Sequence, residues 1–358
     1  MKSYGGDGPD RGIHIIQSTD DHFLIVGNTT TMDNKLDVIL LKCNSQGDTL
    51  WTRRYGGPMD DNGWCIKETS DKGFIITGFT QSYGAQKNDV LLIRTDSEGK
   101  ELWHRTYGGP GDDIAWSVAL NQDGGFTIAA QTNSFGEGKL DAYLIRTDAR
   151  GDTLWTKTFG GPEIDRVFSV DLSSTGNILL AGITYSFGAG DRDAFLLHTN
   201  PEGELLWQRT YGGPGYDNAH SVILNHKDEI LLTGYGHFWG QAGEMDMFLK
   251  QISLDGESAW THSYGGKNND RAMTVIELQD GGYMLTGFTQ SFGAGEWDAY
   301  VVKTGPEGQA EWSGAYGTPA PDYAYDLVQS RSGNYYFTGW SHGSGHPEGN
   351  LLLFKLPQ

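Results

Sequence analysis

The chain has 358 residues, and its 46 acidic against 26 basic side chains give a net charge of −20 at pH 7. This charge argues against nucleic acid and anionic membranes as partners. The sequence also holds no apolar run near the roughly 20 residues that a membrane-spanning helix needs, so we expect no membrane insertion. Its two cysteines, Cys43 and Cys65, have no metal-ligand spacing, and we expect both to be isolated buried thiols.

One unit is repeated along the whole chain with a period of 51 to 53 residues. Each copy opens on an aromatic-Gly-Gly or aromatic-Gly-Thr mark. The seven marks begin at Tyr4, Tyr55, Tyr107, Phe159, Tyr211, Tyr264 and Tyr316. A Trp precedes six of the marks by four residues, and these Trp residues are Trp51, Trp103, Trp155, Trp207, Trp260 and Trp312. Because these Trp residues recur in almost every copy, we interpret them as packing elements.

Within the copy that runs from Tyr107 to Phe159, four β-like runs cover residues 114–120, 126–131, 142–146 and 154–159. Turn sequences such as Asp71-Lys72-Gly73 separate the first and second runs, as hairpin turns require. A period near 50 residues with four short strands is typical of a β-propeller blade. The sequence therefore predicts an all-β, seven-bladed β-propeller with four antiparallel strands per blade, forming one domain over residues 1–358.

The two ends of the chain predict how the ring closes. The last copy starts at Tyr316 and lacks a fourth strand, whereas residues 1–6 have the sequence with which such a strand ends. We expect the N-terminal strand to complete blade seven, because closure leaves no long unpaired edge. Since the chain starts inside a strand and shows no signal peptide, a leader could have been removed and Met1 could be engineered. We expect a secreted, cell-surface or periplasmic monomer.

A family resemblance enters at the junction of the third and fourth strands. The segments 96–103 and 148–155 have the form Asp-x-x-Gly-x-x-x-Trp, which resembles the docking motif of quinoprotein-type propellers. The fuller Tyr-Gly-Gly…Asp-Gly-Gly…Gly-x-Thr pattern resembles repeats of secreted and surface propellers of Bacteroidetes-like bacteria and some archaea. The resemblance covers the whole chain and implies the fold and an exported location, but no particular activity. Quinoprotein dehydrogenases usually have eight blades and an adjacent cysteine pair, and this chain has neither, so we expect no cofactor.

The variable positions of the repeat define a candidate binding site. In a propeller, the fourth-to-first and second-to-third connections emerge together around one mouth of the central channel; we call this side the mouth face. Positions there differ between copies while scaffold positions agree, as expected of a scaffold that carries an asymmetric site. The candidate ligand-binding residues are Trp340, Tyr235, Trp239, Tyr185, His237, His342, Arg11, Arg166 and Arg271.

Three functions fit this face. Aromatic rings beside Asn, Gln and His suit a carbohydrate or a protein ligand, which favours a binding or scaffold module. The alternative is a carbohydrate-active enzyme, most simply a polysaccharide lyase, with arginines binding a uronate carboxylate. Its candidate catalytic residues are His220, His237, His342 and Tyr185. The third is an assembly module that has no small-molecule site.

An Asp follows each mark by six residues, and the series is Asp10, Asp61, Asp113, Asp165, Asp217, Asp270 and Asp322. These carboxylates could form a ring that binds Ca²⁺. Because every copy has one, we favour a structural role in which each Asp accepts hydrogen bonds from its own tight turn. We therefore predict no metal site, with Ca²⁺ at this ring as the weaker alternative.

Overall fold

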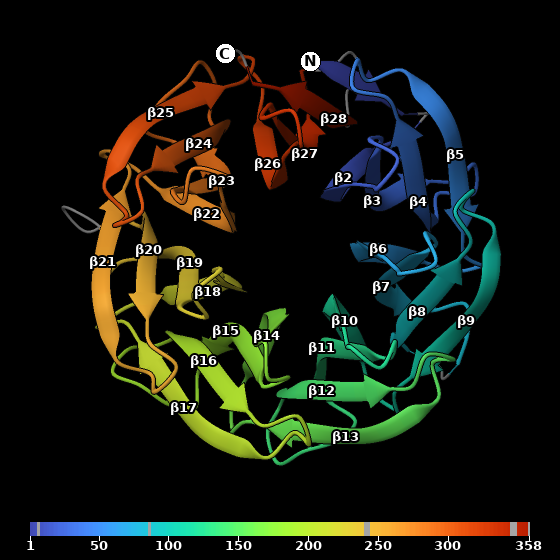
Figure 1. The fold of residues 1–358 in the computed structure, drawn as a ribbon, viewed down its shortest axis with the longest axis horizontal. Helices are drawn as coiled ribbons and strands as arrows, with labels where there is room; N and C mark the ends of the chain where they lie inside the picture. The colour runs from blue at the N-terminus through green and yellow to red at the C-terminus, as the bar shows by residue number, and fades with distance from the viewer. Residues whose placement is uncertain (6–7, 85–86, 240–243, 344–348, 357–358) are drawn as a thin grey trace.

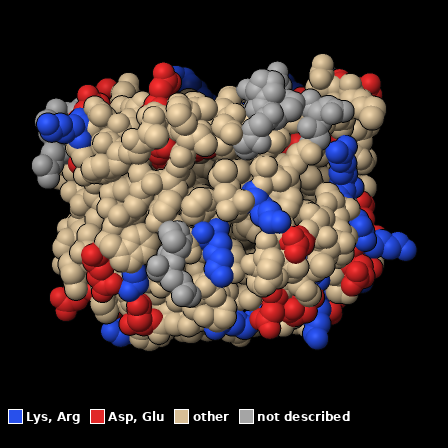
Figure 2. All heavy atoms as spheres, turned by 90° about the horizontal axis from the view of Figure 1, so that it is seen from above, with Lys and Arg blue, Asp and Glu red and all other residues tan. Residues whose placement is uncertain are grey.

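The computed structural model describes residues 1–358 except 6–7, 85–86, 240–243, 344–348 and 357–358. Seven four-stranded antiparallel sheets stand around a central channel, so the predicted seven-bladed β-propeller is confirmed (Figure 1). The described residues contain no helix, and hence none able to cross a membrane. Seen from the side in Figure 2, Lys and Arg lie scattered among Asp and Glu.

The strands of each blade follow one another from the channel outward. Blades one to three consist of β2 (Asp10–Gln17), β3 (Phe23–Thr30), β4 (Leu36–Cys43), β5 (Thr49–Tyr55); β6 (Asp61–Glu68), β7 (Phe74–Thr80), β8 (Asp89–Thr95), β9 (Glu101–Tyr107); and β10 (Asp113–Leu120), β11 (Phe126–Thr132), β12 (Asp141–Thr147), β13 (Thr153–Phe159). Blades four to six consist of β14 (Asp165–Leu172), β15 (Ile178–Thr184), β16 (Asp193–Thr199), β17 (Leu205–Tyr211); β18 (Asp217–Leu224), β19 (Ile230–Gly236), β20 (Asp246–Ile252), β21 (Ser258–Tyr264); and β22 (Asp270–Glu277), β23 (Tyr283–Thr289), β24 (Asp298–Thr304), β25 (Ala310–Tyr316). Blade seven consists of β26 (Asp322–Gln329), β27 (Tyr335–Ser341), β28 (Asn350–Lys355) and β1 (Lys2–Tyr4).

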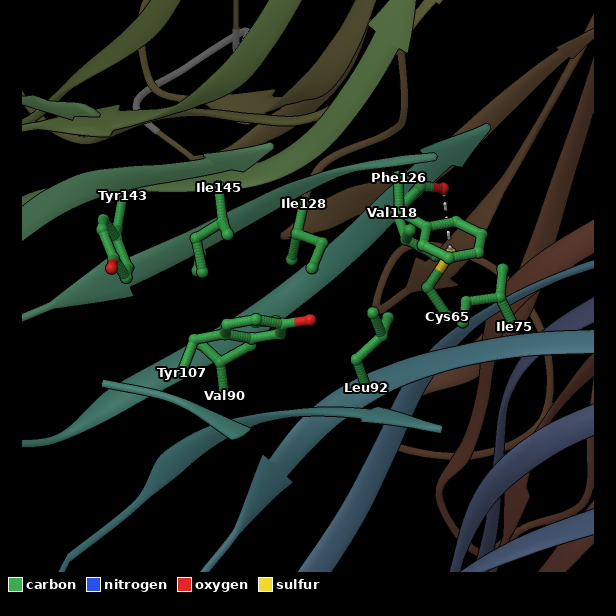
Figure 3. Packing of buried hydrophobic residues seen from close by; sticks show 12 residues of the cluster. Cys65, Ile75, Val90, Leu92, Tyr107, Val118, Phe126, Ile128, Tyr143 and Ile145 are labelled. Atoms are coloured by element: carbon green, nitrogen blue, oxygen red, sulfur yellow. Dashed lines mark hydrogen bonds between the residues drawn. The ribbon is translucent and has the colours of Figure 1, made fainter. Parts of the chain in front are cut away.

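The middle strands of each blade are buried on both faces because each sheet lies between two others. Every residue of β8 and β12 is buried, and their sequences are accordingly nearly continuous apolar runs. In Figure 3, side chains of blades two and three meet in one such layer between sheets. Its members include Ile75, Val90, Leu92, Val118, Ile128 and Ile145. Burial of each such side chain stabilises the fold by about 1.5–3 kcal/mol.

The Asp-x-x-Gly-x-x-x-Trp motif joins neighbouring blades near the rim. Gly99 lies in the turn between β8 and β9 with φ +71°, and a Cβ there would lie 2.7 Å from the Trp51 ring of blade one. The Tyr55 hydroxyl of blade one donates to the carbonyl of the same Gly99 at 2.5 Å. Only a glycine therefore fits, because its bare backbone must lie directly under the indole. Four further marks repeat the hydroxyl bond, from Tyr4 to Gly47, Tyr107 to Gly151, Tyr211 to Gly256 and Tyr264 to Gly308.

The N-terminal strand closes the ring as predicted. β1 pairs antiparallel with β28, with Lys2 opposite Leu353 and Tyr4 opposite Leu351, and the two chain ends lie side by side in Figure 1. Tyr4 packs against the cluster between blades seven and one, and its hydroxyl donates to the Gly47 carbonyl at 2.6 Å.

Removal of residues 1–6 should lower the free energy of unfolding by about 3 kcal/mol, because the deletion removes the packing of an aromatic ring and exposes the edge of β28. Chemical denaturation would measure the loss. The milder variant Tyr4→Phe, which loses only the bond to Gly47, should cost about 1 kcal/mol. Equal stability of the deletion variant and the full chain would contradict closure by this strand.

Candidate functional site

The variable positions of the repeat lie directly opposite one another at the mouth face. Antiparallel pairing of the first and second strands of each blade brings the residue after the repeated Asp beside one near the end of the second strand. These cross-strand pairs are Arg11 with Asn28, Asn62 with Phe79, Ile114 with Gln131, Arg166 with Ile183, Asn218 with Tyr235, Arg271 with Phe288, and Tyr323 with Trp340.

An exposed part of this face is built around the loop before β16. The Arg192 guanidinium lies 5.1 Å from the ring centroid of Tyr216 and 5.8 Å from that of Tyr185, and its Nη1 donates to the Tyr185 hydroxyl at 3.3 Å. Tyr185 and Tyr216 are 39 % and 43 % exposed. The Asp217 N–H donates to the Arg192 carbonyl at 2.8 Å, which fixes the backbone of Arg192 on blade five. We call Tyr185, Arg192 and Tyr216 the Tyr-Arg shelf. Arg192 and Tyr216 are not among the residues singled out from the sequence.

A second arginine is held on aromatic rings in blade six. The Arg271 guanidinium lies 5.0 Å from the ring centroid of Tyr235 and 5.2 Å from that of Trp297. Such cation–π contacts orient a guanidinium without neutralising its charge. Arg271 and Tyr235 are both candidate ligand-binding residues from the sequence, and here they are in contact. Trp297, from the loop before β24, is an additional partner of Arg271.

His220 lies in the channel wall below these arginines. Its ring stacks on Phe168 with centroids 4.9 Å apart and on Tyr235 at 5.6 Å. Burial, and then the positive charges of Arg192 and Arg271, lower the pKa of His220 to about 4. The imidazole is therefore neutral at pH 7. Because Arg192 and Arg271 both lower its pKa, the positive charges of both arginines reach the part of the mouth face where His220 lies.

Blades seven and one form a separate aromatic group. Trp340 stacks on Tyr323 at 5.4 Å, its ring meets His342 at 4.2 Å, and the Arg11 guanidinium lies 4.5 Å from its centroid. The structure thus brings together Arg11, Trp340 and His342, three of the candidate ligand-binding residues. Because Tyr323 and Arg11 already contact the indole, Trp340 is a support for Arg11.

Two predicted site residues have other surroundings. Trp239 packs on Phe248 with ring centroids 3.9 Å apart, in the layer between blades four and five, so it does not join the mouth group. His237 accepts the Tyr216 N–H on Nδ1 at 3.1 Å and so holds the loop that carries Tyr216. Residues 240–243, which complete the loop after Trp239, lie outside the described residues.

A set of aromatic rings lines the channel. Trp64 and Trp116 lie 4.6 Å apart, and Trp116 meets Phe168 edge-on at 5.3 Å. A cavity of about 510 Å³ extends from these rings along the inner strands. Its polar lining includes His14, Lys67, Ser117, Asp171, Ser221 and Asp326.

The prediction that both cysteines are buried free thiols is confirmed, but Cys65 has charged neighbours that the sequence did not indicate. The Cys65 thiol interacts electrostatically with His14, and Cys65 Sγ lies 4.0 Å from the Val118 carbonyl (Figure 3). His14 Nδ1 is 3.6 Å from Asp326 Oδ2, within reach of an ion pair, and that oxygen accepts the Ile15 N–H at 2.9 Å. Asp326, His14 and Cys65 thus form a chain of contacts across blades seven, one and two.

Electrostatics make the two cysteines differ. Burial alone would raise the pKa of Cys65, but the charge and hydrogen bond of His14, together with Lys67, lower it to about 6. Burial alone would lower the pKa of His14, but Asp326 and Cys65 raise it. Burial raises the pKa of the Cys43 thiol to about 11. Both cysteines are buried, so the contrast between them arises from their charged neighbours.

The ultraviolet absorbance of thiolates in the folded chain should therefore distinguish the cysteines without a reagent having to reach the buried sulfur atoms. The thiolate signal of Cys65 should rise between pH 5 and pH 7 with a midpoint near 6, while Cys43 contributes none over that range. The variants Cys43→Ser and Cys65→Ser would assign the signal to one sulfur atom. His14→Gln should move the Cys65 midpoint to above about pH 8, and an unchanged midpoint would contradict the contact.

The repeated Asp residues hold the mouth-face turns as predicted. Asp113 accepts the Gly109 N–H at 2.8 Å and the Ser134 hydroxyl at 2.6 Å. Blades two, four and six repeat both bonds at Asp61, Asp165 and Asp270. Gly56, with φ +153°, lies between two carboxylates, since its Cβ would be 2.6 Å from Asp37 Oδ1 and 2.7 Å from Asp61 Oδ2. Within the described ranges, no three His, Cys, Asp or Glu side chains converge in a way that could hold a metal ion.

Asp113→Ala should lower the free energy of unfolding by about 1–3 kcal/mol, because it leaves a buried turn N–H and a hydroxyl without their acceptor. Unfolding curves of the wild-type chain should also be recorded with Ca²⁺ and with a chelator. If the Asp series serves the turns alone, both curves should coincide. A midpoint that rises with Ca²⁺ and falls in Asp113→Ala would instead establish the calcium alternative.

Comparison with known proteins identifies the class of fold. No family model matches the chain. Over 170 residues, 40% of this chain, it is 25% identical to the regulatory protein FlaEY of Caulobacter vibrioides, and this match spans 18% of that protein. The WD40 domain of Neurospora crassa Pan2 is similar with a TM-score of 0.61 and 13% identity, covering 98% of this chain and 90% of that one.

Two further solved structures are similar over nearly the whole chain. A puromycin hydrolase has a TM-score of 0.59 and 12% identity, over 99% of this chain and 52% of its own. The extracellular domain of a hybrid two component system from B. thetaiotaomicron has a TM-score of 0.56 and 10% identity, over 96% of this chain and 39% of that one. At these identities the similarity shows the propeller fold alone.

Proposed function

We propose that the chain is an exported or cell-surface binding module whose mouth face recognises a carbohydrate. The Tyr-Arg shelf carries this proposal, because two exposed phenol rings share one guanidinium there. Aromatic faces stack on the C–H faces of sugar rings, while guanidinium N–H groups donate to sugar oxygens. The exported location rests on the resemblance of the repeats, and the similar B. thetaiotaomicron structure is an extracellular domain.

A polysaccharide lyase is the second candidate, and the contact between Tyr185 and Arg192 favours it. A lyase needs a proton acceptor beside the cation that binds the uronate carboxylate, and the Tyr185 hydroxyl lies 3.3 Å from Arg192 Nη1. His220 is neutral at pH 7, as a base must be, but its ring is stacked on Phe168 and Tyr235. We place binding first because it requires only the exposed shelf.

A glycan array on the wild-type chain, followed by titration calorimetry on the best ligand, tests binding directly. Loss of one stacking ring should weaken the affinity by roughly fivefold, because such contacts contribute about 1 kcal/mol. Tyr185→Ala and Tyr216→Ala should each show this effect. Trp312→Ala is the matched control, since Trp312 is an aromatic residue 38 % exposed on the outer strand β25.

The remaining outcomes separate the alternatives. Unsaturated sugar products during the titration would establish the lyase. A folded wild-type chain that binds no glycan on the array would overturn the proposed function and leave the protein-binding or assembly role. Equal weakening in all three variants would show that the ligand does not use the Tyr-Arg shelf.

A further inference from the structure

We propose that the ligand of the mouth face is an acidic saccharide, whose carboxylate or sulfate groups are bound by Arg166, Arg192 and Arg271. This inference rests on the proposed function and names the chemistry of its ligand. The three arginines belong to blade four and blade six, on the two sides of blade five, so they form an arc over one part of the mouth.

The first argument is that these arginines have no acidic partner. Elsewhere in the described ranges, basic side chains pair closely with carboxylates, as Arg94 does with Asp71 and Lys303 with Asp280. No ion pair involves Arg166, Arg192 or Arg271 within the same ranges, although the chain has 46 acidic residues for 26 basic ones. Because acidic residues outnumber basic ones, the lack of an acidic partner at all three arginines does not follow from the composition.

The second argument is that each arginine has a donor without an acceptor. Among the arginines that the structure describes, only Arg166, Arg192 and Arg271 have a buried Nε with no hydrogen-bond partner in the protein. Of the other arginines without ion pairs, Arg209 lies over Trp207 on the outer strand β17, and Arg11 of blade one lies over Trp340, away from this arc. A buried Nε without an acceptor means that the protein supplies few hydrogen bonds to these guanidinium groups, so a ligand oxygen bound by their terminal N–H groups adds a bond that the protein does not provide.

The third argument is the positive potential that the arginines create together. Burial lowers the pKa of Arg166, Tyr185 raises it, and the charge of Arg192 lowers it, as expected of a neighbouring cation. Arg192 and Arg271 in turn both lower the pKa of His220. A neutral sugar would leave this repulsion unrelieved, whereas an anion would remove it.

The arrangement also suits the geometry of an oxyanion. Arg192 and Arg271 lie over aromatic rings, which hold each planar guanidinium in place. A guanidinium fixed in this way can present two parallel N–H donors to one carboxylate or sulfate group. The exposed rings of Tyr185 and Tyr216 beside the cations then contact the sugar ring that carries the anion.

The test compares ligands that differ only in charge. Oligogalacturonate and its methyl ester have the same sugars, but the ester lacks the anion; a sulfated oligosaccharide serves as a third probe. Titration calorimetry on the full chain should give an affinity at least roughly tenfold higher for the acid than for the ester, and this preference should shrink as NaCl is raised. Binding of the sulfated probe in preference to both would assign the anion as sulfate.

Variants connect the preference to the arginines. Arg192→Gln and Arg271→Gln should each weaken binding of the preferred anionic probe by about tenfold and weaken binding of the methyl ester much less, because the ester loses only neutral hydrogen bonds whereas the acid also loses its charge partner. Arg209→Gln, which removes an arginine that also lies over a Trp ring, should leave both affinities unchanged. Thermal melting of each variant confirms that it is folded.

Two results would overturn the inference. If the acid and the ester bind equally well to the wild-type chain, the ligand is a saccharide but its charge is not recognised, and the proposed function still stands. If Arg192→Gln and Arg209→Gln weaken acid binding equally, the effect comes from overall charge rather than from this site. Failure of every saccharide on the array would instead refute the proposed function itself.

Discussion

The contact of one blade's tryptophan with the next blade's glycine is the constraint on which the ring depends. Five of the indoles lie on a glycine of the neighbouring turn, as Trp51 does on Gly99, and the Tyr55 hydroxyl is bonded to the same glycine. A second set of bonds joins the blades at the channel, where Ser169 exchanges hydrogen bonds with both the N–H and the carbonyl of Val222. Blades fixed at the rim and at the channel cannot rotate relative to one another.

This double attachment explains why the mouth face is free to vary. The Asp residue that begins each first strand satisfies the turn beside it, so the next position along the strand is not needed to hold that turn. Evolution of the chain can place Arg166, Asn218 or Arg271 there without changing a blade. The result is a symmetric frame whose asymmetry is concentrated around one opening, as binding proteins require.

The fold and the ring closure could be predicted from the sequence because the determining residues recur and act locally. The glycines, aspartates and tryptophans of the repeat each satisfy contacts within one blade or its neighbour, so spacing alone identifies them. Arg166, Arg271 and Tyr235 were also identified, since their positions follow directly from strand register. Arg192, Tyr216 and Trp297 were missed because they lie in loops, where no periodicity indicates which way a side chain points.

The chain of Asp326, His14 and Cys65 was missed for a different reason. A β-bulge interrupts the first strand of each blade, for example between Gly12 and His14. Two successive residues then lie opposite one partner residue, so strict alternation assigns the wrong side to the second of them. Trp239 was misplaced because a stacking contact with Phe248 of its own blade draws the ring into the layer between sheets. Such tertiary packing has no signature in the repeat.

The ring is mechanically weakest at the pairing of β1 with β28, which we call the seam. Lys2 lies opposite Leu353, so the chain enters and leaves this antiparallel pair at the same end. A force applied between the two chain ends would therefore break the hydrogen bonds of this pair one after another, rather than shear all of them together. Every other blade has its four strands linked by turns and would bear load only after the seam had opened. A surface protein tethered through both ends would thus yield first at blade seven, while the arginine arc of blades four to six stayed intact.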